Sequence, residues 1–158
     1  MSSELELLKK LRDITGAGIL DCKKYLVRTS NNVDEAVKLM RSEEGIKADK
    51  KSSRIAAEGV VFYYHNDNLA MLIEINSETD FVSRNEKFQK FVNDCSKIAA
   101  TTDGDLDSLL KSKFIESDKS VEDELTKNIA TIGENLNIRR IEKITLDGPG
   151  SIVSYVHN

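Results

Sequence analysis

Two glycine patterns are the first candidates for chemistry, because closely spaced glycines can cradle the phosphates of a nucleotide. Gly16-Ala17-Gly18 lies between two helix-like stretches and lacks the third glycine of a dinucleotide-binding fingerprint. Gly148-Pro149-Gly150 lacks the lysine of a phosphate-binding loop and separates two strand-like stretches. Ordinary turn formation explains both patterns better than phosphate binding does.

The residues that could act as nucleophiles, general bases or metal ligands are few and scattered. The chain has two histidines, His65 and His157, and two cysteines, Cys22 and Cys95, without the spacing of a zinc site or a disulfide framework. Both cysteines fall on apolar helix faces, and the paired acids stand at turns or helix starts, where they complement helix dipoles. We therefore predict no catalytic residue, no metal ligand and no cofactor.

Charge and hydropathy argue against two further classes of partner. A basic run at residues 47–54 could contact phosphates, but it lacks aromatics and the chain has a net charge of −4, which favours a solvated linker. No apolar run approaches the ~20 residues of a membrane span, and no signal peptide is recognisable. We expect neither a membrane nor a nucleic-acid partner, and a reducing, cytoplasmic compartment.

The elements that position these residues fall into two modules. Residues 1–54 hold 12 Lys and Arg against 9 Asp and Glu, whereas residues 55–158 hold 11 against 18. Helical spacing fills the first range, and strand-type runs occur only in the second. We predict a three-helix module with its linker at 1–54 and a core domain at 55–158.

In the first module, apolar spacing predicts three short helices separated by turns at 15–18 and 29–32, with the third helix fading near Gly45. Their inner faces are predicted to comprise Leu5, Leu8, Leu11, Ile19, Cys22, Tyr25, Leu26, Val33, Ala36, Val37 and Met40.

In the second module, two β-type runs flank a hairpin turn at 65–68, and a helix capped by Asn85 follows. The expected strands are 60–64, 69–75, 137–146 and 151–156, and shorter helices are expected at 106–110 and 121–132. The fold class is therefore α+β, a small three-helix bundle followed by an antiparallel sheet with helices packed on one face.

Phe81 lies on the connection between a strand and a helix, in the stretch NSETDFVSRNEKF. It either packs back onto its own helix as a hydrophobic staple or is presented to a partner. On residue type alone, packing within the domain is the favoured interpretation.

Four stretches carry a resemblance that reverses this preference. They are LKKLRDITGAGILDCKKYL at 8–26, IKADKKSSRIAAEGVV at 46–61, NSETDFVSRNEKF at 76–88, which contains Thr79-Asp80-Phe81-Val82, and IGENLNIRR at 132–140. Respectively they resemble the ubiquitin-associated-like N-terminal module, the linker, the TDFV signature and the second signature of the translation elongation factor Ts family. Their order and spacing agree along nearly the whole chain.

This resemblance implies a guanine-nucleotide exchange factor for elongation factor Tu, which is not an enzyme that makes or breaks covalent bonds. Within the segment Thr79 to Val82, Asp80 and Phe81 would enter the GTPase near its Mg²⁺ site, and Phe81 would act as a wedge that loosens GDP. Because GDP affinity depends on Mg²⁺ and phosphate contacts, such a wedge would speed release.

By the same resemblance, five further residues occupy partner-contact positions. Family members often have methionine where Ile19 and Leu20 stand, and His157 lies in a Ser-Tyr-x-His-like segment. The contact positions are Arg12, Ile19, Leu20, Ile132 and His157.

The chain lacks the second core half, coiled coil and C-terminal element of long family members. We expect either a piece of a longer protein or a short form that completes its core as a homodimer. Two other functions stay open, a ubiquitin-associated-like peptide-binding adaptor using Gly16 to Ile19 and an RNA-binding protein using 47–54. The expected compartment is a bacterial-type cytoplasm or an organellar matrix.

Overall fold

The structure is a computed structural model that describes residues 3–115 and 117–157. Its residues form two compact units, Met1–Lys47 and Ala48–Asn158. The boundary that composition predicts, between residues 54 and 55, falls inside the second unit, and the separability of residues 1–54 stays a prediction. No helix in the described ranges is long and apolar enough to cross a membrane.

The first unit contains α1 (Glu4–Thr15), α2 (Ile19–Arg28) and most of α3 (Val33–Asp49). Ser3 and Glu6 form a capping box at the start of α1, and Gly16 ends that helix with a φ of 67°. The prediction that the third helix fades near Gly45 was wrong. Helix formers flank this glycine, and they outweigh the cost of about 1 kcal/mol that one interior glycine brings.

The core of the first unit follows the predicted stripe with two exceptions. Among the residues of this unit that the structure describes, seven hydrophobic side chains are buried: Leu11, Cys22, Tyr25, Leu26, Val33, Ala36 and Met40. Leu5 and Ile19, which were predicted to face inward, are 76% and 53% exposed. Each stands in the first turn of its helix, and helical spacing alone does not reveal how far the neighbouring helices cover such a turn.

A polar network joins α2 to α3. Glu43 accepts hydrogen bonds from the Tyr25 hydroxyl at 2.5 Å and from Arg28 Nη2 at 2.6 Å, and the Arg28 guanidinium lies 5.2 Å from the centre of the Tyr25 ring. The hydrogen bonds from Arg28 and then Tyr25 lower the pKa of Glu43 to about 2. Burial, followed by the bond to Glu43, raises the pKa of Tyr25 to about 12.

The second unit is built on an antiparallel sheet in the order β1-β2-β3. The strands are β1 (Glu58–His65), β2 (Leu69–Ser77) and β3 (Leu136–Thr145), and the helices α4 (Asp80–Ser83), α5 (Glu86–Ala100), α6 (Leu106–Lys111) and α7 (Val121–Ile132) connect β2 to β3. Asn85 caps α5 by accepting from the amides of Lys87 and Phe88, as predicted. The α+β fold is confirmed.

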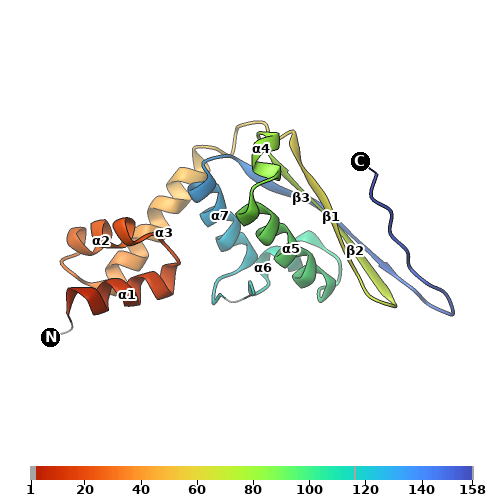
Figure 1. Ribbon diagram of the computed structural model, residues 1–158, viewed down its shortest axis with the longest axis horizontal. Coiled ribbons are helices and arrows are strands. Elements are labelled where there is room, and N and C mark those ends of the chain that lie inside the picture. The colour runs from red at the N-terminus through yellow and green to blue at the C-terminus, as the bar shows by residue number, and fades with distance from the viewer. Residues whose placement is uncertain (1–2, 116, 158) are drawn as a thin grey trace. The chain divides into compact units, whose positions relative to one another are not determined.

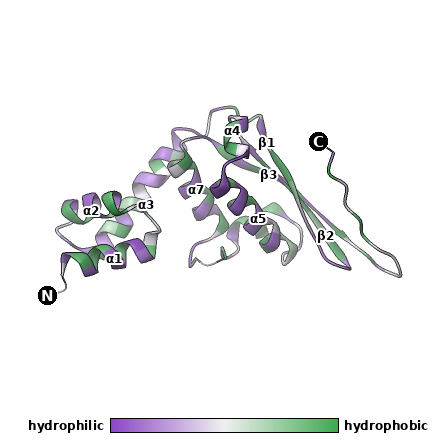
Figure 2. Ribbon diagram, viewed as in Figure 1, coloured by the Kyte–Doolittle hydropathy of each residue, from purple (hydrophilic) through white to green (hydrophobic). Residues whose placement is uncertain are grey.

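One face of this sheet forms the core of the second unit. Alternate residues of β2, including Met71, Ile73 and Ile75, are fully buried against the apolar face of α5, which carries Phe88 and Cys95. Hydrophobic colour runs along β1 and β2 in Figure 2. In the described part of the chain, α5, α6 and α7 lie on the same side of the strands (Figure 1).

The strand predicted at residues 151–156 is absent from the described structure, so that prediction was wrong. The last hydrogen bond to the hairpin is donated by the Leu146 amide to the Asn68 carbonyl at 2.9 Å. Beyond it the segment runs apart from the sheet in Figure 1, with Val153 and Tyr155 86% and 85% exposed. Alternating apolar residues favour a strand only where a neighbouring strand is in place.

The backbone conformation of Gly59 in β1 leads to a testable prediction for the hairpin. Its φ is 134°, and a Cβ added there would lie 2.2 Å from the Ile75 carbonyl oxygen. We expect Gly59→Ala to lower the free energy of unfolding by about 1–3 kcal/mol or more, because both the dihedral and the contact are unfavourable. Gly45→Ala is the matched control, since a Cβ there meets nothing within 4 Å and should stabilise by about 0.5–1 kcal/mol. Equal denaturation curves for the two variants would contradict this account.

The lowered pKa of Glu43 predicts a pH dependence of the first unit. A carboxyl group whose pKa is lower in the folded state stabilises that state above its unfolded pKa. This stabilisation should therefore be full above about pH 4.5 and be lost as the pH falls towards 2. The measurement is the difference in unfolding free energy between wild type and Glu43→Gln, determined at several pH values across this range. A difference that does not change with pH would contradict the assignment.

Candidate functional site

The residues that could perform covalent or metal chemistry are not brought together. Within the described ranges, no three His, Cys, Asp or Glu side chains form a group that could hold a metal ion. Both cysteines are unpaired and buried, and burial raises the pKa of the Cys95 thiol, which disfavours the reactive thiolate. The His65 ring stacks on Tyr63 at a centroid distance of 5.7 Å.

Phe81, on the connection between β2 and α5, has an exposed side chain. It lies in the short helix α4, and 82% of it is exposed. The next residue, Val82, is 8% exposed and belongs to the core of the second unit. Consecutive residues of a helix face different directions, so burial of Val82 directs Phe81 away from the core. The hydrophobic-staple interpretation does not describe this position.

Several hydrogen bonds hold α4 in place. Thr79 precedes the helix and donates its amide and its hydroxyl to the Glu134 carboxylate. At the other end, the Ser83 carbonyl accepts from the side chain of Gln89 in α5. Thr79 and Val82, two of the four signature residues, therefore anchor the helix, whereas Asp80 and Phe81 lie on its surface.

Asp80 forms an exposed ion pair on α4. Its carboxylate is 3.5 Å from Arg84 Nη2, and the two side chains are 53% and 81% exposed. Pairs of this kind contribute about 0–1 kcal/mol in water. The Asp80 carboxylate is therefore accessible at the surface beside Phe81, and breaking its pair with Arg84 costs little.

The structure brings Ile132 close to Phe81. An open pocket of about 550 Å³ lies between α4, the first turn of α5 and the end of α7, and its lining includes Phe81, Ile132 and Lys87. Ile132 is half-buried and packs against the core. Two residues that are far apart in the sequence thus border one hollow in the surface of the second unit.

Three of the predicted contact residues belong to the first unit. Arg12 is exposed near the end of α1, and Ile19 and Leu20 begin α2. Leu20 is 83% exposed and Ile19 is 53% exposed. Two neighbouring aliphatic side chains thus face water at one helix start.

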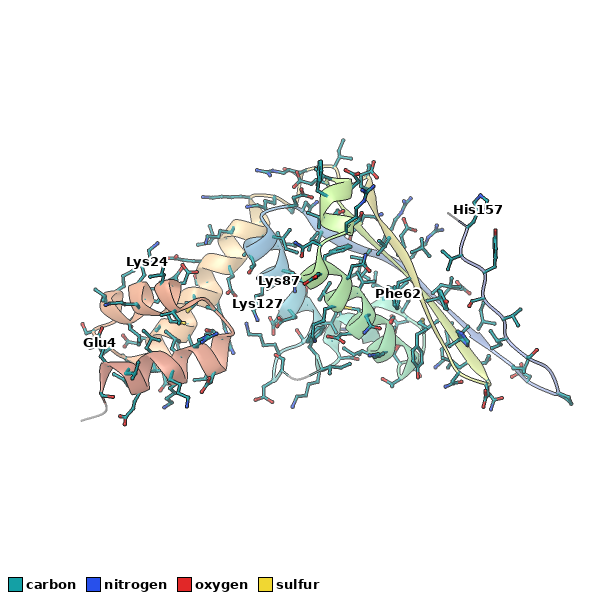
Figure 3. The ribbon with its side chains drawn as sticks, viewed as in Figure 1. Glu4, Lys24, Phe62, Lys87, Lys127 and His157 are labelled. Carbon is teal, nitrogen blue, oxygen red and sulfur yellow. The ribbon has the colours of Figure 1, made fainter. Side chains whose placement is uncertain are left out.

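His157 lies in the terminal segment and outside the pocket beside Phe81. Figure 3 shows it on the segment that follows β3, apart from the helices of the second unit. Its exposed ring has Nδ1 3.5 Å from the Tyr155 hydroxyl. In the described part of the chain, His157 contacts Tyr155 and is not brought together with the other predicted contact residues.

Glu134 and Glu78 hold the start of α4, although neither was predicted from the sequence. Glu134 binds Thr79 directly, and Glu78 accepts a hydrogen bond from the Asn135 amide at 2.6 Å. Both acids lie inside stretches that carry the family resemblance, so their position in those stretches was the available signal. Their side-chain chemistry alone did not separate them from other surface acids.

Known proteins that resemble the chain carry the same family name. A family model described as elongation factor TS matches residues 78–158. Proteins named elongation factor Ts from Rhizobium johnstonii and Methylobacterium radiotolerans are 43% and 45% identical to the chain, each over 96% of it and 49% of the relative. The Rhizobium meliloti protein of the same name is 42% identical over 100% of the chain and 51% of its own length.

These matches place the chain among the translation elongation factors. The chain belongs to the elongation factor Ts family. It spans about half the length of the curated relatives it matches. The relatives are named as elongation factors and not as enzymes.

The exposure of Leu20 predicts a separation between folding and binding. We expect Leu20→Glu to change the unfolding free energy by no more than about 0.5 kcal/mol, since the side chain is already in water. In any complex that buries this surface, the same variant should bind its partner about tenfold more weakly or worse, because the new charge must be desolvated in the contact. Leu26→Glu is the matched control, because Leu26 is 2% exposed and its replacement should unfold the first unit. Melting of the Leu20 variant in circular dichroism would contradict the prediction.

Proposed function

We propose that the chain is a guanine-nucleotide exchange factor for elongation factor Tu during translation elongation. Membership of the family supports this proposal, and one structural observation carries it. Phe81, in the middle of the Thr79 to Val82 signature, is 82% exposed on a helix whose neighbouring residue is fixed in the core. An exposed aromatic on a rigid support suits a residue that enters another protein.

The proposed mechanism needs no covalent step. Phe81 inserts between side chains of the GTPase near its Mg²⁺ site, and the Mg²⁺ contacts that hold the GDP phosphates are lost. The exposed carboxylate of Asp80 enters beside it. By thermodynamic linkage, a chain that binds the nucleotide-free GTPase more tightly must weaken GDP binding by the same factor.

The remaining predicted contact residues hold the partner in this proposal. Arg12, Ile19 and Leu20 bind the GTPase from the first unit, and Ile132 lines the hollow that receives a side chain of the partner beside Phe81. His157 contributes from the terminal segment. Contacts of this kind supply the binding energy that pays for disturbing the nucleotide site. We assign the reaction to the compartment in which translation occurs, a bacterial-type cytoplasm or an organellar matrix.

The homodimer also stays part of the proposal. The side of the sheet away from α5 exposes Val61 and Leu72, which are 65% and 36% exposed. These residues border a shallow pocket of about 340 Å³ together with Glu74 and Arg140, whose side chains pair at 2.6 Å. An apolar centre next to charges of both signs is suited to a second copy of the same surface.

A mixing experiment separates this function from its alternatives. Elongation factor Tu loaded with labelled GDP is incubated with and without the chain, and release is followed in time. Acceleration supports exchange. A peptide-binding adaptor or an RNA-binding protein would instead leave the release rate unchanged and be retained on immobilised ubiquitin or RNA.

The sharpest prediction concerns Phe81→Ala. Since the ring is exposed, we expect the unfolding free energy to change by about 0.5 kcal/mol or less. GDP release from elongation factor Tu should slow by about tenfold or more if the ring is a dominant contact, and Asp80→Ala should give a smaller loss. Phe88→Ala is the matched control. Phe88 is fully buried, and its truncation should cost about 3–5 kcal/mol of stability.

A chelator provides a second control for the Phe81 variant. Removing Mg²⁺ weakens the nucleotide site without any wedge, so it should shrink the difference in release rate between wild type and Phe81→Ala. A Phe81→Ala variant that is folded and releases GDP at the wild-type rate would overturn the wedge.

A further inference from the structure

Two loops of the second unit exchange hydrogen bonds immediately before α4. Glu134 Oε2 accepts from the Thr79 amide at 3.0 Å, and Glu134 Oε1 accepts from the Thr79 hydroxyl at 2.6 Å. In return, Glu78 Oε1 accepts from the Asn135 amide at 2.6 Å. Each loop therefore supplies both a carboxylate and a backbone donor to the other. The four residues are called the Glu134 clamp below.

The clamp holds the residue that precedes α4, a helix without a side-chain cap. Thr79 is the N-cap residue of α4, yet its side chain makes no capping hydrogen bond to the helix. Its hydroxyl is donated to Glu134 instead. A helix of four residues cannot sustain itself, because helix nucleation is unfavourable and needs tertiary contacts to offset it. The direction of α4, and with it that of Phe81, depends on what holds its two ends.

The end of α7 fixes the position of Glu134. Gly133 ends that helix with a φ of 90°, a conformation that favours glycine, and the chain turns there from Ile132 into Glu134. Ile132 borders the same open pocket as Phe81. The short segment from Ile132 to Glu134 therefore has two roles. Ile132 lines the pocket, and Glu134 holds α4, which carries Phe81 on another side of the same pocket.

The clamp also contacts the segment that leads into β1. Asn135 Nδ2 donates to the Arg54 carbonyl at 2.7 Å, and Arg54 Nη1 lies 3.6 Å from Glu78 Oε1. The Glu78 carboxylate is thus engaged on two sides, and its side chain is 22% exposed. Hydrogen bonds to carboxylates are shorter and stronger than neutral ones, and a paired set restricts geometry further. Hydrogen bonds and an ion pair therefore join three segments of the second unit here: the one before β1, the one before α4 and the one after α7.

We propose that Glu134 is a positioning residue for nucleotide exchange, holding α4 so that Phe81 is presented in one orientation. The inference rests on the proposed function, and it concerns a residue that does not itself enter the GTPase. Loss of the clamp leaves Phe81 exposed but mobile. The chain then still binds its partner through its other contacts, while fewer of the bound complexes have the ring in place.

The test compares four forms of the chain: wild type, Glu134→Ala, Glu134→Gln and Glu122→Ala. The alanine variant removes both bonds to Thr79. The glutamine variant keeps an acceptor for the Thr79 amide and the shape of the side chain, so it should restore most of the function. Glu122 is an exposed acid at the opposite end of α7 and serves as the matched control.

Two measurements separate positioning from general stability. Amide hydrogen exchange of residues 79–85 in the free chain reports the order of α4, and it should be faster in Glu134→Ala alone. GDP release from elongation factor Tu, titrated with each chain, gives a half-saturating concentration and a maximal rate. We expect the maximal rate to fall about tenfold or more while half-saturation changes little.

Each outcome decides between the interpretations. An unchanged maximal rate in folded Glu134→Ala overturns the inference and leaves the proposed function standing, as does a glutamine variant as slow as the alanine variant. No acceleration by the wild-type chain overturns the proposed function and this role with it.

A second variant covers the case in which Glu134→Ala does not fold. Thr79→Val removes only the hydroxyl bond and should reduce the maximal rate less than the complete loss of Glu134 does. Where both single variants fold, their effects should overlap in the double variant, because they break the same contact. Fully multiplicative effects on the maximal rate would overturn the clamp.

Discussion

The packing of α5 on one face of the sheet is the constraint from which the second unit follows. Phe88 and Cys95 are completely buried against Met71, Ile73 and Ile75, and this apolar contact fixes where α5 begins. The start of α5 in turn fixes α4, because Asn85 caps the longer helix and only one residue separates it from Ser83. An exposed aromatic can keep a defined place only if the residues on both sides of it are held in this way.

The sequence was sufficient for elements whose formation is local. The helix at Val121–Ile132 and the hairpin of β1 and β2 have strong caps, turns and periodicity, and the structure has them where they were predicted. Two errors have a common cause, which is that burial is decided by neighbours. Ile19 continues the stripe of its helix yet is half exposed, and the alternation at 151–156 finds no strand to pair with. Spacing describes one element, whereas exposure depends on what another element covers.

The candidate site was predicted less completely than the fold, for a related reason. Resemblance pointed to Asp80 and Phe81 as surface residues of one signature, but it could not show that Thr79 and Val82 of the same signature serve to anchor them. Nor could composition single out Glu134, whose importance comes from a hydrogen bond across 55 residues of sequence. Side-chain contacts between segments that are far apart along the chain are the features that a single sequence predicts least well.

The two cysteines have a practical consequence. Each unit holds one of them at 0% exposure in its own core, Cys22 in the first and Cys95 in the second. A thiol reagent can reach either sulfur only when the surrounding helices open, so the rate of labelling at each site measures the opening free energy of that unit. Mass spectrometry of the two labelled peptides would then read the local stability of both halves in a single sample, without any introduced probe.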